Sequence, residues 1–208
     1  WDAGGLYQVG SFPAFNRFAE WNGKYRDDMR SFLKGDDGKA EAAALRLTGS
    51  PDLYHPELRQ NASINFLNCH DGFTLYDLYA YNTKHNEANG WDNTDGDNNG
   101  LSWNCGAEGE TDDPQVIALR RRMIKNAWVA LMGSRGTPMF FAGDEFGNSQ
   151  SGNNNAYCQD SPLSWLDWSL TEKNQDLLDF ATFMIHFRKA HPVIWKNTGS
   201  CSLGFPAI

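Results

Sequence analysis

The sequence predicts an α/β fold built on a parallel sheet, because short apolar segments alternate with helical patterns along the chain. The strands are expected at residues 18–21, 64–67 and 137–142, and an amphipathic pattern follows each of them. Such alternation is typical of parallel strands joined by right-handed crossovers. A closed barrel of this kind needs eight strands, so the three strands predicted here are expected to be neighbours within a larger barrel.

Composition limits the classes of protein that fit. The chain has 208 residues, of which 40% are apolar and 13% aromatic, which is enough for a sizeable core and excludes a disordered chain. The net charge is −8, and no dense cluster of Lys and Arg is present, so no nucleic-acid partner is expected. No apolar run reaches the length of about 18 residues that a membrane span requires.

The cysteines do not indicate a metal site. The four thiols are far apart in the sequence and form no Cys-x-x-Cys pair, so neither a structural zinc nor any other metal or cofactor is predicted. Two disulfides remain an alternative to reduced thiols.

The first β/α unit follows a loop predicted at residues 1–17. Tyr25, Met29, Phe32 and Leu33 recur at helical spacing and predict a helix that ends at Gly35. Asp27 and Asp28 are expected near its start, where negative charge suits the helix dipole. A short helix is expected near residues 42–45 within a polar segment.

The second unit carries the most informative pattern of the chain. The predicted strand at residues 64–67 is followed by His70 and Asp71, then by Gly72, and a helix is expected over residues 74–81. Titratable side chains just before a β-to-α turn are typical of catalytic residues in barrel and doubly wound enzymes. The alternative is that a strand simply becomes polar where it reaches water.

A long polar segment follows at residues 82–114 and is expected to be functional or disordered. Its aromatic residues, Trp91 and Trp103, argue against disorder and would either stack on sugars or be buried. Residues 95–100 match the first half of a calcium loop, but Gly106 stands where a bidentate Glu is required, so an EF-hand is rejected.

The third unit begins with a long helix over residues 116–131, with Pro114 in its first turn and Gly136 as its expected end. The strand at 137–142 ends at Asp144 and Glu145, which either reach a cleft or orient loops by binding backbone. A last amphipathic helix is expected over residues 174–189. After Pro192 the pattern becomes β-like, which suggests residues 1–194 as one domain and 195–208 as the start of a C-terminal β domain.

Several motifs, taken in order, resemble the α-amylase superfamily of glycoside hydrolases and, within it, the isoamylase-type or glycogen-debranching group. The resemblance covers nearly the whole chain. The segments that carry it are WDAGGLYQVG at 1–10, WNGKYRDD at 21–28, NFLNCHDGFTL at 65–75, HNEANG at 85–90, LSWNCG at 101–106, GDEFG at 143–147 and GNNNAY at 152–157. It implies a partial TIM (β/α)8 barrel with about strands six to eight, strands one to five being missing.

The resemblance also implies hydrolysis of α-1,6 branch linkages by a retaining mechanism with two carboxyl groups about 5 Å apart. Asp71 matches a third acidic residue, which stabilises the transition state by accepting hydrogen bonds from the sugar hydroxyls, and His70 would bind the same sugar. The nucleophile and the acid/base Glu belong to segments before residue 1. The chain is therefore expected to be an inactive fragment of an active parent.

The resemblance implies branched α-glucans (amylopectin, glycogen or limit dextrin) as partners, in a homo- or hetero-oligomer, without nucleic acid or membrane. The expected compartment is a plastid (chloroplast or amyloplast) or the bacterial cytoplasm, not the secreted fraction. Two alternatives remain open: a non-catalytic glucan-binding or assembly subunit, and a transglycosylase on the same scaffold.

Overall fold

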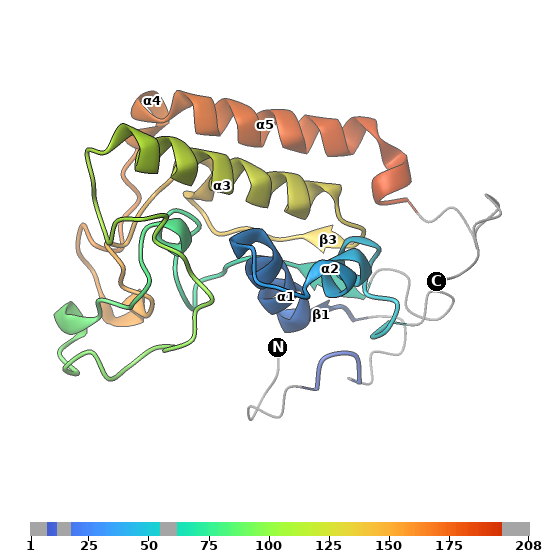
Figure 1. Ribbon diagram of the computed structural model, residues 1–208, viewed down its shortest axis with the longest axis horizontal. Coiled ribbons are helices and arrows are strands. Elements are labelled where there is room, and N and C mark those ends of the chain that lie inside the picture. Colours follow the sequence, from blue (N-terminus) through green and yellow to red (C-terminus); the bar gives the residue numbers. More distant parts are fainter. Residues whose placement is uncertain (1–7, 12–17, 55–61, 197–208) are drawn as a thin grey trace.

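The fold is organised around a three-stranded parallel sheet in the order β1-β2-β3 (Figure 1). The computed structural model describes residues 8–11, 18–54 and 62–196. The strands are β1 (Glu20–Trp21), β2 (Ser63–Asn65) and β3 (Thr137–Pro138). Glu20 pairs with Ser63, and Ile64 pairs with Thr137. The predicted α/β class with parallel strands is confirmed.

All three strands are shorter than predicted, and β1 begins only at Glu20 instead of residue 18. Phe66 and Leu67 are buried but leave the ladder after Asn65. In β3, Pro138 has no N–H to donate to a neighbouring strand. The chain still runs beside β2 beyond it, because the Met139 N–H donates to the Asn65 carbonyl at 2.8 Å.

The first helix, α1 (Gly23–Lys34), confirms the predicted helix that ends at Gly35. The Asn22 side chain accepts a hydrogen bond from the Tyr25 N–H, and Gly35 adopts the left-handed conformation that closes the helix. Asp27 and Asp28 do not begin it, which corrects their assignment to a helix start. Instead they pair with Arg26 and with Arg46 of α2 (Ala40–Leu47).

The longest helix, α3 (Pro114–Gly133), begins where predicted, with the Asp113 side chain accepting from the Gln115 N–H. It ends before Gly136, contrary to the prediction. The Arg188 guanidinium of α5 donates to the Met132, Ser134 and Gly136 carbonyls, and so provides partners that a glycine cap would otherwise supply. Helices α3 and α5 lie side by side in Figure 1.

Helix α5 (Gln175–Ala190), preceded by the single turn α4 (Leu170–Lys173), confirms the last predicted helix. Leu177, Ala181 and Met184 are buried, while Leu178 and Ile185 are half-buried. Beyond it, η5 (Pro192–Ile194) is a 3₁₀ turn, so the β-like pattern expected after Pro192 does not appear there. Residues 197–208 and most of 1–17, with the β domain and the loop predicted there, lie outside the described residues.

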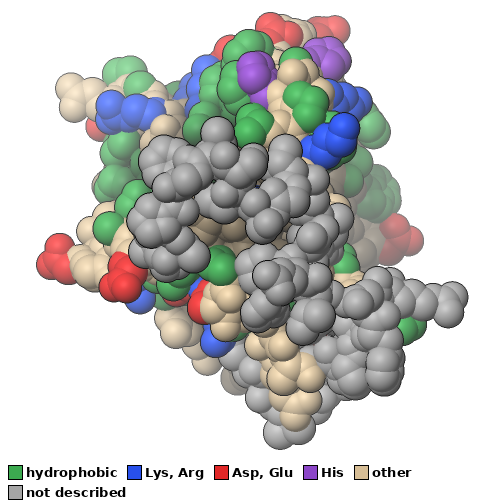
Figure 2. All heavy atoms as spheres, turned by 90° about the vertical axis from the view of Figure 1, so that its right-hand side faces the viewer, with side chains coloured by type: hydrophobic (Ala, Val, Ile, Leu, Met, Phe, Trp, Pro, Cys, Tyr) green, Lys and Arg blue, Asp and Glu red, His purple; other side chains and the backbone are tan. Residues whose placement is uncertain are grey.

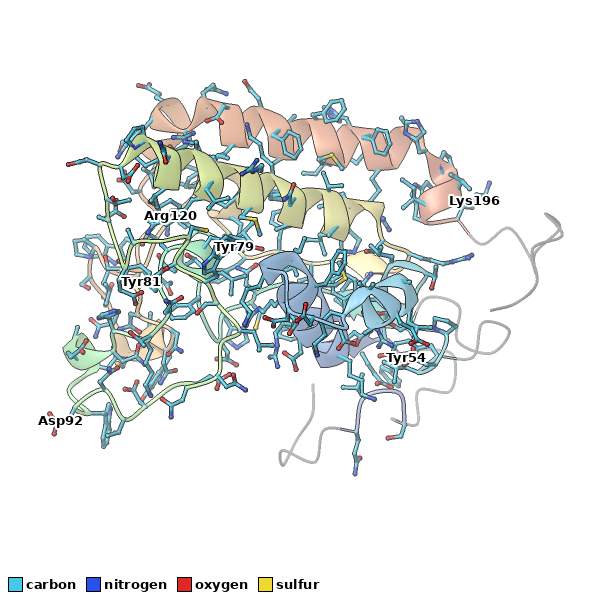
Figure 3. The ribbon with its side chains drawn as sticks, viewed as in Figure 1. Tyr54, Tyr79, Tyr81, Asp92, Arg120 and Lys196 are labelled. Atoms are coloured by element: carbon cyan, nitrogen blue, oxygen red, sulfur yellow. The ribbon has the colours of Figure 1, made fainter. Side chains whose placement is uncertain are left out.

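The helix expected over residues 74–81 is absent, and only the 3₁₀ turn η1 (Asp77–Tyr79) forms there. The carbonyls that would continue a helix are taken by the long loop, because Leu78 O accepts from the Trp103 N–H and Ala80 O from the Gly109 N–H. Figure 3 shows Tyr79 and Tyr81 on this segment near Arg120 of α3, and Asp92 far out on the long loop. Two local bonds of helical spacing do form, from the Leu78 N–H to the Thr74 carbonyl and from the Tyr81 N–H to the Asp77 carbonyl, but the contacts with the long loop stop the helix from continuing.

The long loops contain only short turns, namely η2 (Glu87–Asn89), η3 (Asp144–Phe146) and η4 (Ala156–Cys158). The hydrophobic core lies between the helices and the sheet, with Trp128 of α3 almost fully buried. Figure 2 shows hydrophobic, His and basic side chains gathered near the C-terminal end of α5, where Phe187 and Trp195 are exposed. In the described part of the chain, no helix has the length and apolarity to cross a membrane.

Candidate active site at the carboxyl end of the sheet

His70 and Asp71 lie together just beyond the carboxyl end of β2. The His70 Nε2 atom is 3.3 Å from the Asp71 carboxylate, and the two side chains are 59% and 67% exposed. The His70 ring also meets the Trp21 ring edge to face, with 5.9 Å between centroids. The pair is thus presented to solvent at a strand end, as the sequence predicts.

The turn after the pair is fixed by a contact with another loop. Gly72 has φ of +100°, a conformation that residues with side chains rarely adopt. Its N–H donates to the Asn154 carbonyl at 2.9 Å. The backbone next to Asp71 is therefore held by the segment that follows β3.

Asp144 does not reach the exposed site, and the prediction that it orients loops is the one confirmed. Its buried carboxylate accepts hydrogen bonds from the Leu75 and Phe141 N–H groups and from the Asn68 amide, at 2.9–3.0 Å. Burial raises the pKa of Asp144 to about 7, against the effect of these bonds, which favour the ionised form. Glu145 accepts from the Gly143 N–H.

Asp77 connects the same two loops in the opposite direction, from the loop after β2 to the loop after β3. Its carboxylate is fully buried and accepts from the Ser149 hydroxyl and from the Gln150 N–H at 2.8 Å. Burial raises the pKa of Asp77 to about 6, although these hydrogen bonds favour the charged form. One acidic residue from each of the two loops is therefore buried against the other loop.

A network of amide side chains joins the HNEANG and GNNNAY motifs. The Asn86 side chain donates to Asn154 Oδ1 and accepts from the Asn154 N–H, both at 2.9 Å. Asn89 exchanges hydrogen bonds with Asn153, and Asp95 accepts from both Asn89 and Asn155. Asn86 and Asn153 are fully buried. The sequence analysis missed this network because amide pairing leaves no charge pattern; the Asn-rich motifs were its only signal.

Asp95, part of the incomplete calcium loop, is used within this network. Among the described residues, no group of three or more His, Cys, Asp and Glu is arranged to hold a metal ion. Of the two tryptophans considered for sugar stacking, Trp91 is 59% exposed, whereas Trp103 is half-buried against the core. The alternative that Trp91 is buried under the long loop is therefore wrong.

A cavity of about 280 Å³ opens beside Asp71. One wall comes from α1, with Arg26 and Arg30, and the others come from the loops. The remaining lining residues are Asp71, Gly72, Phe73, Gly96, Asp97, Gly100, Asn154 and Asn155. The guanidinium of Arg30 bridges two segments, donating from Nε to the Leu67 carbonyl at 2.6 Å and from Nη1 to the Gly100 carbonyl at 2.9 Å.

The sequence is similar to those of proteins named as glycogen-operon proteins, isoamylases and a glycogen debranching enzyme. It is 57% identical to a "Glycogen operon protein GlgX homolog" of Mycobacterium tuberculosis and 51% identical to "Isoamylase 3, chloroplastic" of Oryza sativa subsp. japonica, in each case over 95% of this chain. It is 47% identical, over the same share, to a "Glycogen debranching enzyme" of Dickeya chrysanthemi. These matches confirm the resemblance to the isoamylase-type, glycogen-debranching group.

The chain covers only part of these relatives, namely 27%, 25% and 30% of their lengths. Among solved structures, a pullulanase from Bacillus acidopullulyticus matches with a TM-score of 0.63 and 22% identity, over 85% of this chain and 19% of that one. This likeness confirms an α/β fold of the kind found in that enzyme. No protein-family model matches the chain.

Proposed function

We propose that this chain, which is homologous to a segment of isoamylase-type glycogen-debranching proteins, belongs to an enzyme that hydrolyses the α-1,6 branch linkages of glycogen- or starch-type glucans. The observation that carries the proposal is the exposed pair of His70 and Asp71 at the carboxyl end of β2. The names of the relatives support it, as does the order of the motifs.

In this proposal, β1, β2 and β3 are strands six to eight of a (β/α)8 barrel, and the rest of the barrel is supplied by the parent protein. The parallel order of the three strands and the likeness to the pullulanase support this placement. Catalytic groups of such barrels lie at the carboxyl ends of the strands. The nucleophile and the acid/base Glu would come from the parent, so the chain alone would be inactive.

Asp71 would act on the glucosyl unit at the cleaved bond. Its carboxylate would accept hydrogen bonds from ring hydroxyls, and these bonds strengthen as positive charge develops on the ring in the oxocarbenium-like transition state. His70, in contact with that carboxylate, would bind the same unit and orient it. Branched α-glucans would be the substrates. The compartment would be a plastid or a bacterial cytoplasm. This is supported by one relative that is named chloroplastic and another that comes from a bacterium.

The test is the release of linear chains from amylopectin by the full-length protein. Wild type should release them, and Asp71→Asn should abolish turnover without changing the melting temperature, while the exposed control Asp37→Asn retains activity. Cleavage of α-1,4 linkages alone would refute the subgroup assignment. Glucan binding without cleavage by wild type would instead favour a non-catalytic binding subunit, and normal turnover by Asp71→Asn would refute the role of Asp71.

A further inference from the structure

The peptide group between Asp71 and Gly72 is held at both edges. The Gly72 N–H donates to the Asn154 carbonyl at 2.9 Å, and the Cys69 thiol donates to the Asp71 carbonyl, with 3.4 Å between sulfur and oxygen. The Asp71 side chain is 67% exposed, so it gains little support from packing. The position of its carboxylate therefore depends on how this peptide group is oriented.

Asn154 is buried and uses each of its four polar groups. Its carbonyl accepts from Gly72, and its N–H donates to Asn86 Oδ1 at 2.9 Å. In its side chain, Oδ1 accepts from Asn86 Nδ2 at 2.9 Å, and Nδ2 donates to the Asp97 carbonyl at 2.7 Å. Asn86 thus binds both the backbone and the side chain of Asn154, which requires a side chain with a donor and an acceptor. The carbonyl that holds Gly72 is therefore located by the long loop.

Asn86 is itself fixed by its own loop. Its N–H donates to Asn93 Oδ1 at 2.8 Å, and its Nδ2 donates to the Asp95 carbonyl at 3.0 Å. The loop also packs closely on the amide pair, because a Cβ atom placed on Gly96 would lie 2.7 Å from Asn86 Nδ2. A fully buried amide with partners on its own loop is a rigid support for Asn154.

We propose that Asn86 is a positioning residue for Asp71, which acts through Asn154 and the Gly72 N–H. This rests on the proposed function, since it concerns the reaction in which Asp71 stabilises the transition state. Asn86 is fully buried and does not contact the substrate. Its loss would let the peptide group after Asp71 reorient, and the displaced carboxylate would lose hydrogen bonds that are strongest in the transition state. The effect is therefore expected on kcat rather than on KM.

The first test is the steady-state kinetics of the full-length protein on amylopectin. Asn86→Ala should lower kcat about 10- to 100-fold and leave KM within about twofold of wild type, because a displacement of about 1 Å caused by a remote substitution can cost about 100-fold in rate. An unchanged kcat, or a rise in KM alone, would overturn the proposal.

The matched control is Asn174→Ala. Asn174 is also buried, and its side chain is hydrogen-bonded to the Phe146 carbonyl and to the Arg121 guanidinium. Neither partner belongs to the turn after β2 or to the loop that carries Asn86. This variant should lose a similar amount of stability but keep kcat within about twofold of wild type. An equal fall in kcat for both variants would reduce the role of Asn86 to stability and overturn the proposal.

Hydrogen–deuterium exchange, measured by mass spectrometry, tests the same contact without turnover. The Gly72 amide should be protected in wild type and should exchange about tenfold faster in Asn86→Ala, but not in Asn174→Ala. Equal exchange in wild type and Asn86→Ala would overturn the proposal. A wild-type protein that releases no chains would refute the proposed function separately, since the exchange measurement does not depend on activity.

If Asn86→Ala fails to fold, Asn86→Asp decides the question. This variant keeps the volume of the side chain and the acceptor for the Asn154 N–H, and it removes only the donor to Asn154 Oδ1 and to the Asp95 carbonyl. It should lower kcat about tenfold with KM within about twofold. A kcat equal to that of wild type would overturn the proposal.

Discussion

Asp77 and Asp144 tie the same two loops together from opposite sides. Asp77 lies after β2 and binds backbone N–H groups of the loop after β3, whereas Asp144 lies after β3 and binds Asn68 and the Leu75 N–H after β2. Both carboxylates are buried. This reciprocal arrangement fixes the position of the turn that presents His70 and Asp71. The hydrogen bonds of the two buried carboxylates go to other residues of the two loops.

Replacement of Asp144 should therefore destabilise the protein strongly. Asp144→Ala leaves the Leu75 and Phe141 N–H groups and the Asn68 amide without their acceptor, and we expect a loss of about 3 kcal/mol in unfolding free energy, measured by urea denaturation. The exposed Asp37→Ala should change it by less than about 0.5 kcal/mol. An equal effect of the two substitutions would contradict the structural role of Asp144.

Two glycines with the same backbone conformation provide a matched pair. Gly152 and Gly90 both have φ of +78°, but a Cβ on Gly152 would lie 2.7 Å from the Tyr81 ring and 2.9 Å from His85, whereas one on Gly90 would meet nothing within 4 Å. Both Ala variants carry the strain of the left-handed conformation, about 1 kcal/mol. Gly152→Ala should lose about 1–3 kcal/mol more through overpacking.

The comparison is made by denaturant unfolding of both variants under the same conditions. Since the backbone strain is common to both, the difference isolates the steric contact with the Tyr81 and His85 rings. Equal stabilities would show that the loop carrying Gly152 shifts freely away from these rings.

Glu108 should make stability depend on pH in the acid range. Burial opposes its ionised form, but hydrogen bonds from the Asn82 and Thr83 N–H groups, the Asn104 amide and His85 lower the pKa of Glu108 to about 2. A carboxyl group with a lowered pKa in the folded state stabilises the fold above its unfolded pKa of about 4.3, and this stabilisation is lost as the pH falls toward 2.

The expected result is that Glu108→Gln is less stable than wild type at pH 6 and that the difference shrinks as the pH falls from about 4.5 to 2. Melting temperatures across this range measure it, with Glu41→Gln, an exposed change on α2, as the control. A difference that stayed constant with pH would mean that charge on Glu108 does not contribute.

The sequence predicted the helices that carry a clear 3.6-residue apolar period, as in α1, α3 and α5, because their buried faces match that period. It failed at residues 74–81, where the carbonyls of Leu78 and Ala80 bind the long loop instead of continuing a helix. It also misplaced the end of α3, because the guanidinium of Arg188 lies 56 and 54 positions further along the chain than the carbonyls of Met132 and Ser134 that it binds.

Some residues of the candidate site could be predicted from the sequence and others could not, for the same physical reason. The pair His70 and Asp71 was found because a titratable motif follows an apolar run within a few residues. Asn86, Asn154 and Arg30 were not found, because their roles depend on partners in distant segments and no local pattern marks an amide pair or a buried donor.

The hydrogen bonds between Asn86 and Asn154 also bear on folding kinetics. They join positions 68 apart, so they form only after a long stretch of chain has been closed, at a cost in entropy that local helices do not incur. We therefore expect this part of the chain to assemble after the transition state. Asn86→Ala should accelerate unfolding and leave the folding rate almost unchanged in stopped-flow experiments, so a slower folding rate would place the contact in the nucleus instead.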